Sequence, residues 1–288
     1  MIEKRGSSMI GSILLPMDSS SYTQAGLNLA SDISSKTKAK LFGMSIVDEP
    51  AITETKAKPL GSAGFSDRAK ESVLKEAFDA ADALFQTFDK TAKERRIQSE
   101  FIRKTGNPTE EIIHEMVKHD LLVIGSKTYF KYATQREECD TFSHITKSTH
   151  RPMMIVPEDV SPNSFKEAVI TTDGSILSNK SIQMFVLTGL ANQYEKITVI
   201  SSSSNIDQAQ SNVKTVSEYL SHHNIKCIEK PIHAPDTTWE PVIGYFKEHN
   251  PSLLVMGVYG TGGVKEFFVG SFTSAILGKI NSPIFTSR

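Results

Sequence analysis

The stretch LLVMGVYGTGGVKEFFVGS, residues 253–271, decides how this chain is interpreted. It begins as a short apolar run, breaks into glycines at positions 257, 260, 262 and 263, and closes with Gly270 and Ser271 ahead of a helix-like segment. That order predicts a strand, a glycine loop and a helix start. Glycines bring bare backbone close to a ligand, and the first N–H groups of a helix attract anions. The pattern favours an anion site, and an ordinary surface turn stays open as the alternative.

The chain repeats one pattern twice. Residues 13–18, ILLPMD, correspond to residues 168–173, AVITTD, and residues 121–125, LLVIG, correspond to residues 253–257, LLVMG. The two aspartates are 155 residues apart (173 − 18), whereas the two glycines are 132 apart (257 − 125). The second half is therefore a shortened copy, and we expect the first half to carry an extra loop between its first and fourth strands.

Apolar runs and helix-spaced stripes alternate along both halves. Alternating strands and helices predict a parallel sheet covered on both faces. The fold class is thus α/β, with two tandem doubly wound domains over residues 1–157 and 164–288 and a linker at 157–163. Helices are expected at 22–35, 67–95, 138–148, 177–192, 206–223 and 238–249, with a further helix capped by Asn107 and Pro108 and the last one capped from Asp236, Thr237 and Thr238.

Composition narrows the function classes. A length of 288 residues allows about two domains, and 39% apolar with 23% charged residues is typical of a soluble globular protein. A net charge of −1 argues against nucleic acid or an anionic membrane as partner. Cys139 and Cys227 lie outside any CxxC pair, and no apolar stretch reaches the ~18 residues needed to span a bilayer. We expect a cytoplasmic protein, because the N-terminus is a poor signal peptide.

The glycine spacing carries a resemblance. The spacing resembles the ATP-binding signature of the universal stress protein family: two residues separate Gly257 from Gly260, and nine separate Gly260 from Gly270, which Ser271 follows. The upstream strand that ends in Asp173 fits the same family, and the chain contains neither a Walker loop nor a GxGxxG fingerprint. The resemblance covers nearly the whole chain as a tandem pair. It implies five-stranded parallel sheets of the adenine nucleotide alpha hydrolase-like fold.

The resemblance also implies ligand and roles. The ligand would be ATP or ADP, with or without Mg. Asp173 would contact the ribose or adenine, Thr171 would lie near the base, the main chain of Ile200 would bind the adenine edge, and Gly257 would lie against the ribose. The phosphates would be held by Gly260, Thr261, Gly262, Gly263, Gly270, Ser271 and Thr273. Thr171 and the pair Ser201-Ser202 stand where the family has a proline and an acidic residue, which bears on affinity for the base.

The first half lacks most of this equipment. Thr128 stands where Gly260 falls, the loop at 127–132 reads KTYFKY, and Cys139-Asp140 stand where Gly270-Ser271 fall. We expect that this half does not bind ATP in the usual way, although it keeps Pro16 and Asp18. It would be a structural partner, or its aromatic loop would contact another ligand.

Other candidate sites are weaker. Cys139, Asp140, His144 and His150 are close in sequence, but their spacing matches no zinc template, so a solvated helix face is the preferred interpretation and no metal site is predicted. No Ser-His-Asp or Cys-His arrangement and no pair of carboxylates can be recognised from the spacing, so no catalytic residue is predicted. The leading hypothesis is a stress-response or regulatory protein that binds nucleotide with slow or no hydrolysis. A weak ATP-hydrolysing enzyme and a nucleotide-independent interaction module are the alternatives.

Partners follow from the same resemblance. In the family, the last strands of two units pair across a dimer interface. Residues 153–156 and 284–286 are expected to pair in this way within one chain, as a pseudo-dimer. Two chains could in addition form a homodimer, and the sequence leaves this alternative open.

Overall fold

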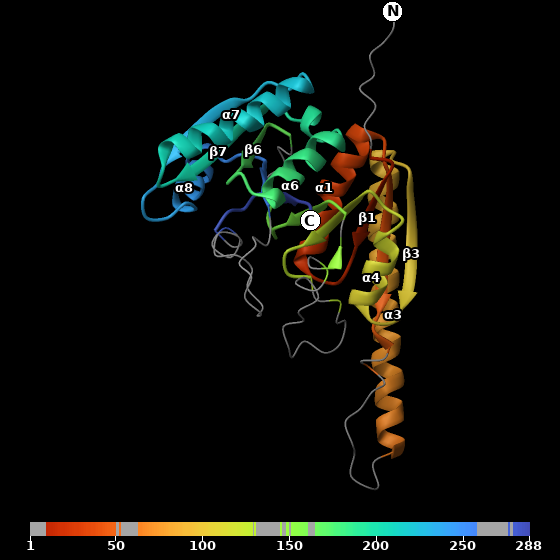
Figure 1. Cartoon of the computed structure of the whole chain (residues 1–288). Coiled ribbons are helices and arrows are strands. Elements are labelled where there is room, and N and C mark those ends of the chain that lie inside the picture. The colour runs from red at the N-terminus through yellow and green to blue at the C-terminus, as the bar shows by residue number, and fades with distance from the viewer. Residues whose placement is uncertain are drawn as a thin grey trace, which may run out of the picture. The chain divides into compact units, whose positions relative to one another are not determined.

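A computed structural model describes residues 10–49, 52, 63–128, 130, 145, 148–149, 151–160, 165–257, 276 and 279–288. The chain divides into two compact units, residues 11–149 and 150–288 (Figure 1). The glycine loop from residue 258 to 275 and nearly all of the helix expected at 138–148 lie outside the described residues.

The first unit is built on four parallel strands in the order β3-β2-β1-β4. They span Ser12–Pro16 (β1), Lys40–Val47 (β2), Ser99–Thr105 (β3) and Leu121–Gly125 (β4). Strands β1 and β4 are almost wholly buried, as expected for a parallel sheet covered on both faces.

Three helices accompany these strands: α1 (Ser21–Thr37), α3 (Ala63–Arg95) and α4 (Pro108–Met116). The expected cap of α4 is confirmed, since the Asn107 side chain accepts hydrogen bonds from the N–H groups of Thr109 and Glu110 and Pro108 stands at the first position. Helix α3 begins at Ala63, four residues earlier than expected, and has 33 residues against 17 in its counterpart α7. The first half is therefore longer partly because α3 is longer than α7, and not only because of an extra loop.

The second unit has the strand order β5-β10-β9-β6-β7-β8. The strands span Met153–Val156 (β5), Glu167–Thr171 (β6), Lys196–Ser203 (β7), Ile228–His233 (β8), Leu253–Val255 (β9) and Ile284–Thr286 (β10). Strands β6 to β10 run parallel, and β5, which ends the first repeat in sequence, pairs antiparallel with β10 through Ile155 opposite Ile284. The expected pairing of the two last strands is thus confirmed within the chain.

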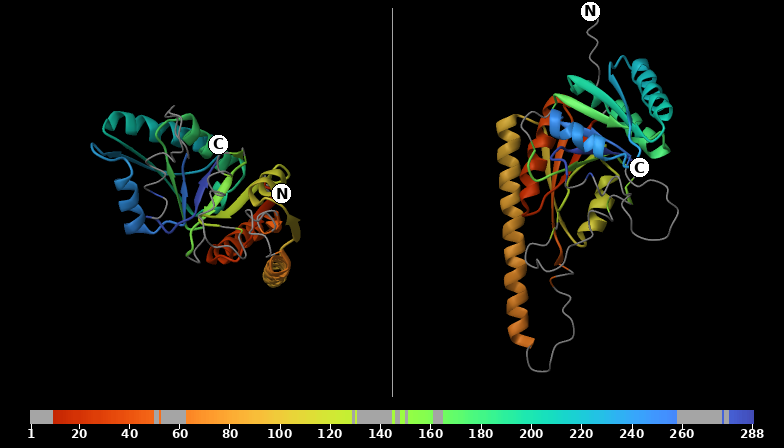
Figure 2. Two further views of the ribbon diagram at one scale, coloured as in Figure 1. Left: turned by 90° about the horizontal axis from the view of Figure 1, so that it is seen from below. Right: turned by 90° about the vertical axis from the view of Figure 1, so that its left-hand side faces the viewer.

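Helices cover both faces of this second sheet. They are α6 (Ile176–Leu187), α7 (Ile206–His222) and α8 (Glu240–His249), with a 3₁₀ turn at Ala191–Gln193. Because side chains alternate along a strand, Thr198 and Ser201 on β7 point to opposite faces. Ser201 meets Asn212 of α7 and Thr198 meets Tyr245 of α8, so these helices lie on opposite sides of the strands (Figure 2).

Helix α8 begins differently from the expectation. The cap predicted from Asp236, Thr237 and Thr238 is wrong, because the N-cap is Trp239, in αR geometry and without a side-chain cap. Pro241 in the first turn has no N–H, so one fewer donor there needs a partner. Among the described residues, no helix is long and apolar enough to cross a membrane.

Candidate functional site

The second sheet reverses its winding between β6 and β9. From β6 the chain moves outward through β7 and β8, and β9 and β10 then lie on the other side of β6. Ligands of doubly wound sheets bind beyond the carboxyl ends of the strands at such a switch point. Asp173 follows β6, and Gly257 follows β9, which pairs directly with β6. The structure therefore brings two predicted site residues to adjacent strand ends.

Asp173 presents an exposed, ionised carboxylate at this edge. Its Oδ1 accepts a hydrogen bond from the N–H of Ser175 at 2.9 Å. Partial burial of the carboxyl raises the pKa of Asp173, but hydrogen bonds from Ser175 and Ser178 outweigh it and hold that pKa below its ordinary value. The group is a stable anion at neutral pH, suited to accept hydrogen bonds and weak as a base.

The turn that carries Asp173 is fixed by its neighbours. The hydroxyl of Thr172 accepts from the N–H of Gly174 at 3.1 Å, and the hydroxyl of Ser175 caps helix α6. Gly174 has a φ of +77°, and a Cβ there would lie 2.8 Å from Oδ1 of Asn212. Only glycine fits both constraints, so the backbone places Asp173 at the strand end in one conformation.

Gly257 packs against the start of α6. A Cβ at this position would lie 2.6 Å from the backbone nitrogen of Ser178 and 2.9 Å from the carbonyl carbon of Leu177. The glycine therefore lets β9 approach the first helical turn, beside the strand end that carries Asp173. The other predicted phosphate-binding residues, from Gly260 to Thr273, lie outside the described residues.

Thr171 and Ile200 are buried within the sheet. The Thr171 hydroxyl donates to the carbonyl of Val255 at 3.2 Å, which ties β6 to β9 at the switch point. The carbonyl of Ile200 accepts from the N–H of Thr172 at 3.0 Å. Both residues thus hold the strand ends together, and the roles near the base that the resemblance gave them stay predictions.

The sequence pointed to the pair Ser201-Ser202 but did not distinguish between their two hydroxyls. The hydroxyl oxygen of Ser202 is buried and has no hydrogen-bond partner among the residues that the structure describes. The only sequence signal was that a serine pair ends the strand beside β6; nothing in the pattern distinguished the satisfied Ser201 from Ser202.

The equivalent edge of the first unit is closed by its own side chains. Asp18 is 3% exposed, and its Oδ1 accepts from the N–H of Ser20 at 3.0 Å and from the hydroxyl of Thr23 at 2.9 Å. Its Oδ2 accepts from the main-chain N–H of Phe130 at 3.1 Å. Phe130 is fully buried and has a φ of +48°. The carboxylate that corresponds to Asp173 is therefore already occupied.

Gly125, the counterpart of Gly257, is also crowded. A Cβ there would lie 2.5 Å from the hydroxyl of Thr128 and 2.6 Å from the Cβ of Tyr22, and the Thr128 hydroxyl donates to the carbonyl of Gly125. Side chains thus pack closely against the strand end of β4, whereas Tyr129, Lys131 and Tyr132 of the loop that was expected to be bulky lie outside the described residues.

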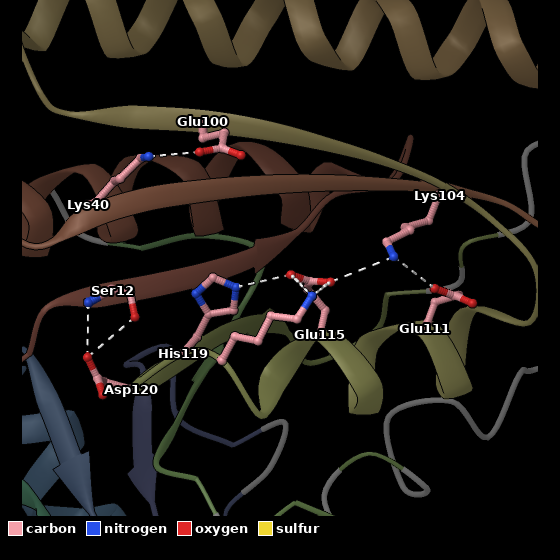
Figure 3. Close-up of polar contacts among 9 residues, drawn as sticks. Ser12, Lys40, Glu100, Lys104, Glu111, Glu115, His119 and Asp120 are labelled. Atoms are coloured by element: carbon pink, nitrogen blue, oxygen red, sulfur yellow. Dashed lines mark hydrogen bonds and ion pairs between the residues drawn. The ribbon is translucent and has the colours of Figure 1, made fainter.

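A charged cluster lies elsewhere in the first unit. Glu115 on α4 receives Lys118 at 2.9 Å and lies 3.8 Å from Lys104, while His119 lies 3.7 Å from its other oxygen (Figure 3). Within the part of the chain that the structure describes, no group of three His, Cys, Asp or Glu side chains could hold a metal. The weaker candidates Cys139, Asp140, His144 and His150 lie outside that part.

The chain was compared with family models, with curated proteins and with solved structures. No family model matches the chain. Universal stress protein Slr1230 of Synechocystis is 23% identical over 96% of this chain and 99% of its own length. The crystal structure of a universal stress protein from Archaeoglobus fulgidus superposes with a TM-score of 0.71 at 16% identity, over 97% of this chain and 99% of that one. The functionally unknown protein PA1789 from Pseudomonas aeruginosa has a TM-score of 0.56 at 12% identity, over 97% of this chain and 92% of that one.

The parallel sheets with their switch-point edges define a tandem α/β protein of the adenine nucleotide alpha hydrolase-like fold. Over nearly the full length of both chains, this protein is similar in sequence to one universal stress protein and in fold to another.

Proposed function

We propose that the second unit binds an adenine nucleotide, ATP or ADP, at the carboxyl ends of β6 and β9, and that the first unit does not. The chain would act as a cytoplasmic stress-response or regulatory protein whose bound nucleotide sets a conformation or a partner surface. The supporting observation is the contrast between exposed Asp173 and Asp18, which is buried and bound by the N–H of Phe130.

The chemistry of Asp173 suits a ribose. An ionised carboxylate offers only acceptors, and the two hydroxyls of a ribose are donors that it can bind together. The same negative charge repels phosphates. The phosphates would therefore lie away from Asp173, toward the glycine loop that follows Gly257, which is the arrangement that the sequence predicts.

Slow or absent hydrolysis follows from the same group. A general base works best when its pKa lies near the operating pH, and the pKa of Asp173 is held below that of an ordinary carboxyl. Asp173 would therefore bind the nucleotide without activating water. Magnesium, where it accompanies ATP, would be bound mainly by phosphate oxygens and water, as is usual for this ion. Chelation should then weaken ATP binding and leave AMP binding unchanged.

The first experiment identifies the ligand. Protein purified gently is denatured, and the released small molecules are analysed by mass spectrometry; unfolding is then followed with and without ATP, ADP and AMP. A single site should raise stability by ~2.7 kcal/mol at a hundred times its dissociation constant. Asp173→Ala should abolish this rise, and Asp236→Ala, at an exposed position following β8 in the same unit, should keep it.

Absence of adenine nucleotide, together with melting that no nucleotide changes, would contradict the proposal and favour a nucleotide-independent interaction module. Steady ATP turnover that Asp173→Ala removes would instead favour an enzyme.

A further inference from the structure

Two strands, β3 and β8, are each paired on one side only among the described residues. Strand β3 pairs with β2, and β8 pairs with β7. The unpaired N–H and C=O groups of such an edge can pair with another chain, and many proteins prevent this with a proline. The last strands of the two repeats, β5 and β10, already pair with each other within the chain. Strand pairing between two copies of the chain would therefore use β3 or β8.

A proline blocks the free edge of β8. The N–H of Ala234 donates to the carbonyl of Ser203 on β7. Backbone groups point alternately to the two sides of a strand, so the groups of Glu229, Pro231 and His233 point away from β7. Pro231 stands at the centre of this outward row and has no N–H to donate.

No proline interrupts β3, which lies at the outer edge of the first unit's strands (Figure 1). On either side of this seven-residue strand, the carbonyl of Gln98 and the N–H of Gly106 bond to β2. By the same alternation, the outward row belongs to Ser99, Phe101, Arg103 and Thr105. Each of these residues has an N–H and a carbonyl, so β3 offers an uninterrupted edge to a further strand.

The charges of β3 match a second copy of the same strand. In an antiparallel pair centred on Ile102, Glu100 faces Lys104 of the partner subunit on both sides of the two-fold axis. These positions turn their backbone away from the partner, and facing residues of that kind bring their side chains closest. The side chains of Glu100 and Lys104 are 54% and 32% exposed, so both can reach across.

The facing charges also continue a row that exists within one chain. Glu100 pairs with Lys40 at 2.7 Å, and Lys104 lies 3.6 Å from Glu111 (Figure 3). Across the junction, the order would be Lys40, Glu100, then Lys104 and Glu111 of the partner subunit. Positive and negative groups would alternate throughout, which favours this register over one with like charges opposite each other.

The opposite face of β3 fits the same register. The guanidinium carbon of Arg103 lies 4.5 Å from the ring centroid of Phe85 and 5.7 Å from that of Phe101. With Ile102 at the centre, Arg103 faces Phe101 of the partner subunit. A guanidinium is attracted to the face of an aromatic ring, so the aromatic contacts of Arg103 extend to the second copy.

Helix α3 leaves room for this pairing. It packs on both β2 and β3. With strands about 4.8 Å apart, two such helices would lie about 10 Å from each other, a normal distance for packed helices. Asp82 and Phe85 of α3 contact Arg103, and Phe78, on the same helix face, is 47% exposed. The pairing would place this exposed ring beside the helix of the second copy.

We propose that two copies of this chain associate through β3, as an antiparallel strand pair centred on Ile102 with the two α3 helices beside it. The first unit, whose Asp18 is bound by its own loop, then serves as the dimerisation unit. This role is separate from the nucleotide binding proposed for the second unit.

The test measures the mass of the full chain in solution by analytical ultracentrifugation over a range of concentrations. Wild type should form a dimer. Glu100→Lys places two lysines opposite each other at both symmetry-related positions and should raise the dissociation constant about 10-fold or more. Lys104→Glu should do the same. An equal mixture of the two variants should restore the dimer, because lysines then face glutamates. Glu229→Lys, at the edge of β8, is the matched control and should change nothing.

A cysteine pair tests the register even if Lys104→Glu is unstable beside Glu115. Facing residues of the kind expected at Ile102 have Cα atoms about 4.5 Å apart, which suits a disulfide. Ile102→Cys should therefore give a cross-linked dimer under mild oxidation, above the level of wild type. Thr105→Cys, on the same strand, should not, since its two copies would be about 20 Å apart.

A monomeric wild type, or a dimer that Glu100→Lys leaves intact, would overturn the inference. So would a mixture of folded Glu100→Lys and Lys104→Glu that stays monomeric, or equal cross-linking of Ile102→Cys and Thr105→Cys. Each variant should keep the nucleotide affinity of wild type, so these outcomes are independent of the proposed function.

Discussion

In the first unit, the main-chain N–H of Phe130 donates to Oδ2 of Asp18 at 3.1 Å. At the corresponding strand end of the second unit, Asp173 is exposed. One repeat thus uses its aspartate to bind its own loop. In the second repeat the corresponding carboxylate accepts from the N–H of Ser175 in its own turn and remains exposed. This difference between two copies of one pattern is the physical basis for assigning nucleotide binding to one unit.

Asp18→Asn should therefore destabilise the first unit and leave nucleotide binding intact. The amide NH₂ group of asparagine would face a hydrogen-bond donor, either the N–H of Phe130 or the N–H of Ser20 and the hydroxyl of Thr23. The loss of hydrogen bonds to a buried charge costs on the order of 3 kcal/mol. Chemical unfolding measures the loss, with Asp79→Asn, at an exposed position on α3, as the control. If folded Asp18→Asn lost its response to ATP, the assignment of binding to the second unit would be wrong.

Gly257→Ala should destabilise the second unit. The added Cβ would meet the backbone of Ser178 and Leu177, and backbone atoms cannot move aside as a flexible side chain can. We expect a loss of about 1–3 kcal/mol, as in other overpacked sites, together with weaker nucleotide binding.

Gly244 provides the control for that substitution. It lies within α8, and a Cβ there would meet no atom of the described residues within 4 Å outside its own helix turn. Gly244→Ala should stabilise the protein by about 0.5–1 kcal/mol, because alanine is the better helix former. A Gly257→Ala protein as stable as wild type would show that β9 and α6 are less closely packed than the distances indicate.

The buried imidazole of His119 should make stability fall on acidification. Burial lowers the pKa of His119 below its ordinary value of 6.5 more than Glu115 raises it, and within the described part of the chain neither ring nitrogen has a partner at hydrogen-bond distance. Among the charged groups around it are Glu115 and Asp120 (Figure 3) and Lys118, and the ring centroid of Phe42 lies 4.6 Å from that of His119. As pH falls through 6.5, the unfolded chain takes up this proton before the folded chain does, so stability decreases down to the lowered pKa.

His119→Phe should flatten this part of the stability curve, and His114→Gln, at an exposed position of α4, should not. The carboxyl of Glu115 affects stability at lower pH than His119 does. Burial raises its pKa, but Lys118 and Lys104 lower it more, so its contribution is present above 4.5 and is lost below. Unfolding in denaturant, followed from pH 8 to well below 4.5, tests both; a pH dependence below 6.5 that His119→Phe leaves unchanged would contradict the first.

A buried carboxylate also stabilises the second unit. Glu167 accepts from the hydroxyls of Thr198 at 2.6 Å and Tyr245 at 2.8 Å, and Lys196 lies at 2.9 Å. Tyr245→Phe removes one of these hydrogen bonds and should cost about 1–2 kcal/mol without affecting nucleotide affinity, because Glu167 begins β6 at the end opposite to Asp173. Tyr219→Phe, on the half-buried side of α7, is the matched control in an unfolding measurement. A loss of affinity in Tyr245→Phe would show coupling between the two ends of the sheet.

Much of the fold could be predicted from the sequence because the decisive signals are local. The runs before Asp18 and Asp173, the runs before Gly125 and Gly257, and the Asn107 cap all depend on residues close together in the chain, and each element formed as expected. The cap of α8 failed, since several residues there could cap and tertiary packing selects one.

The site was predictable only in part. The switch-point pair of Asp173 and Gly257 follows from repeat and spacing. In contrast, the hydrogen bond that the Ile200 carbonyl accepts, and the lack of a partner for Ser202 among the described residues, depend on register and on the face of β7. Likewise, a bulky first-unit loop could be expected from KTYFKY, whereas the specific bond from Phe130 to Asp18 joins residues 112 positions apart. Such long-range contacts have no local signature.

The most direct test of the central claim is the stoichiometry of nucleotide binding. Calorimetric titration of ATP into the full chain should give one site per chain, abolished by Asp173→Ala and retained, with the same affinity, by folded Asp18→Asn. Two sites per chain, or one site that survives Asp173→Ala and disappears in Asp18→Asn, would contradict the account.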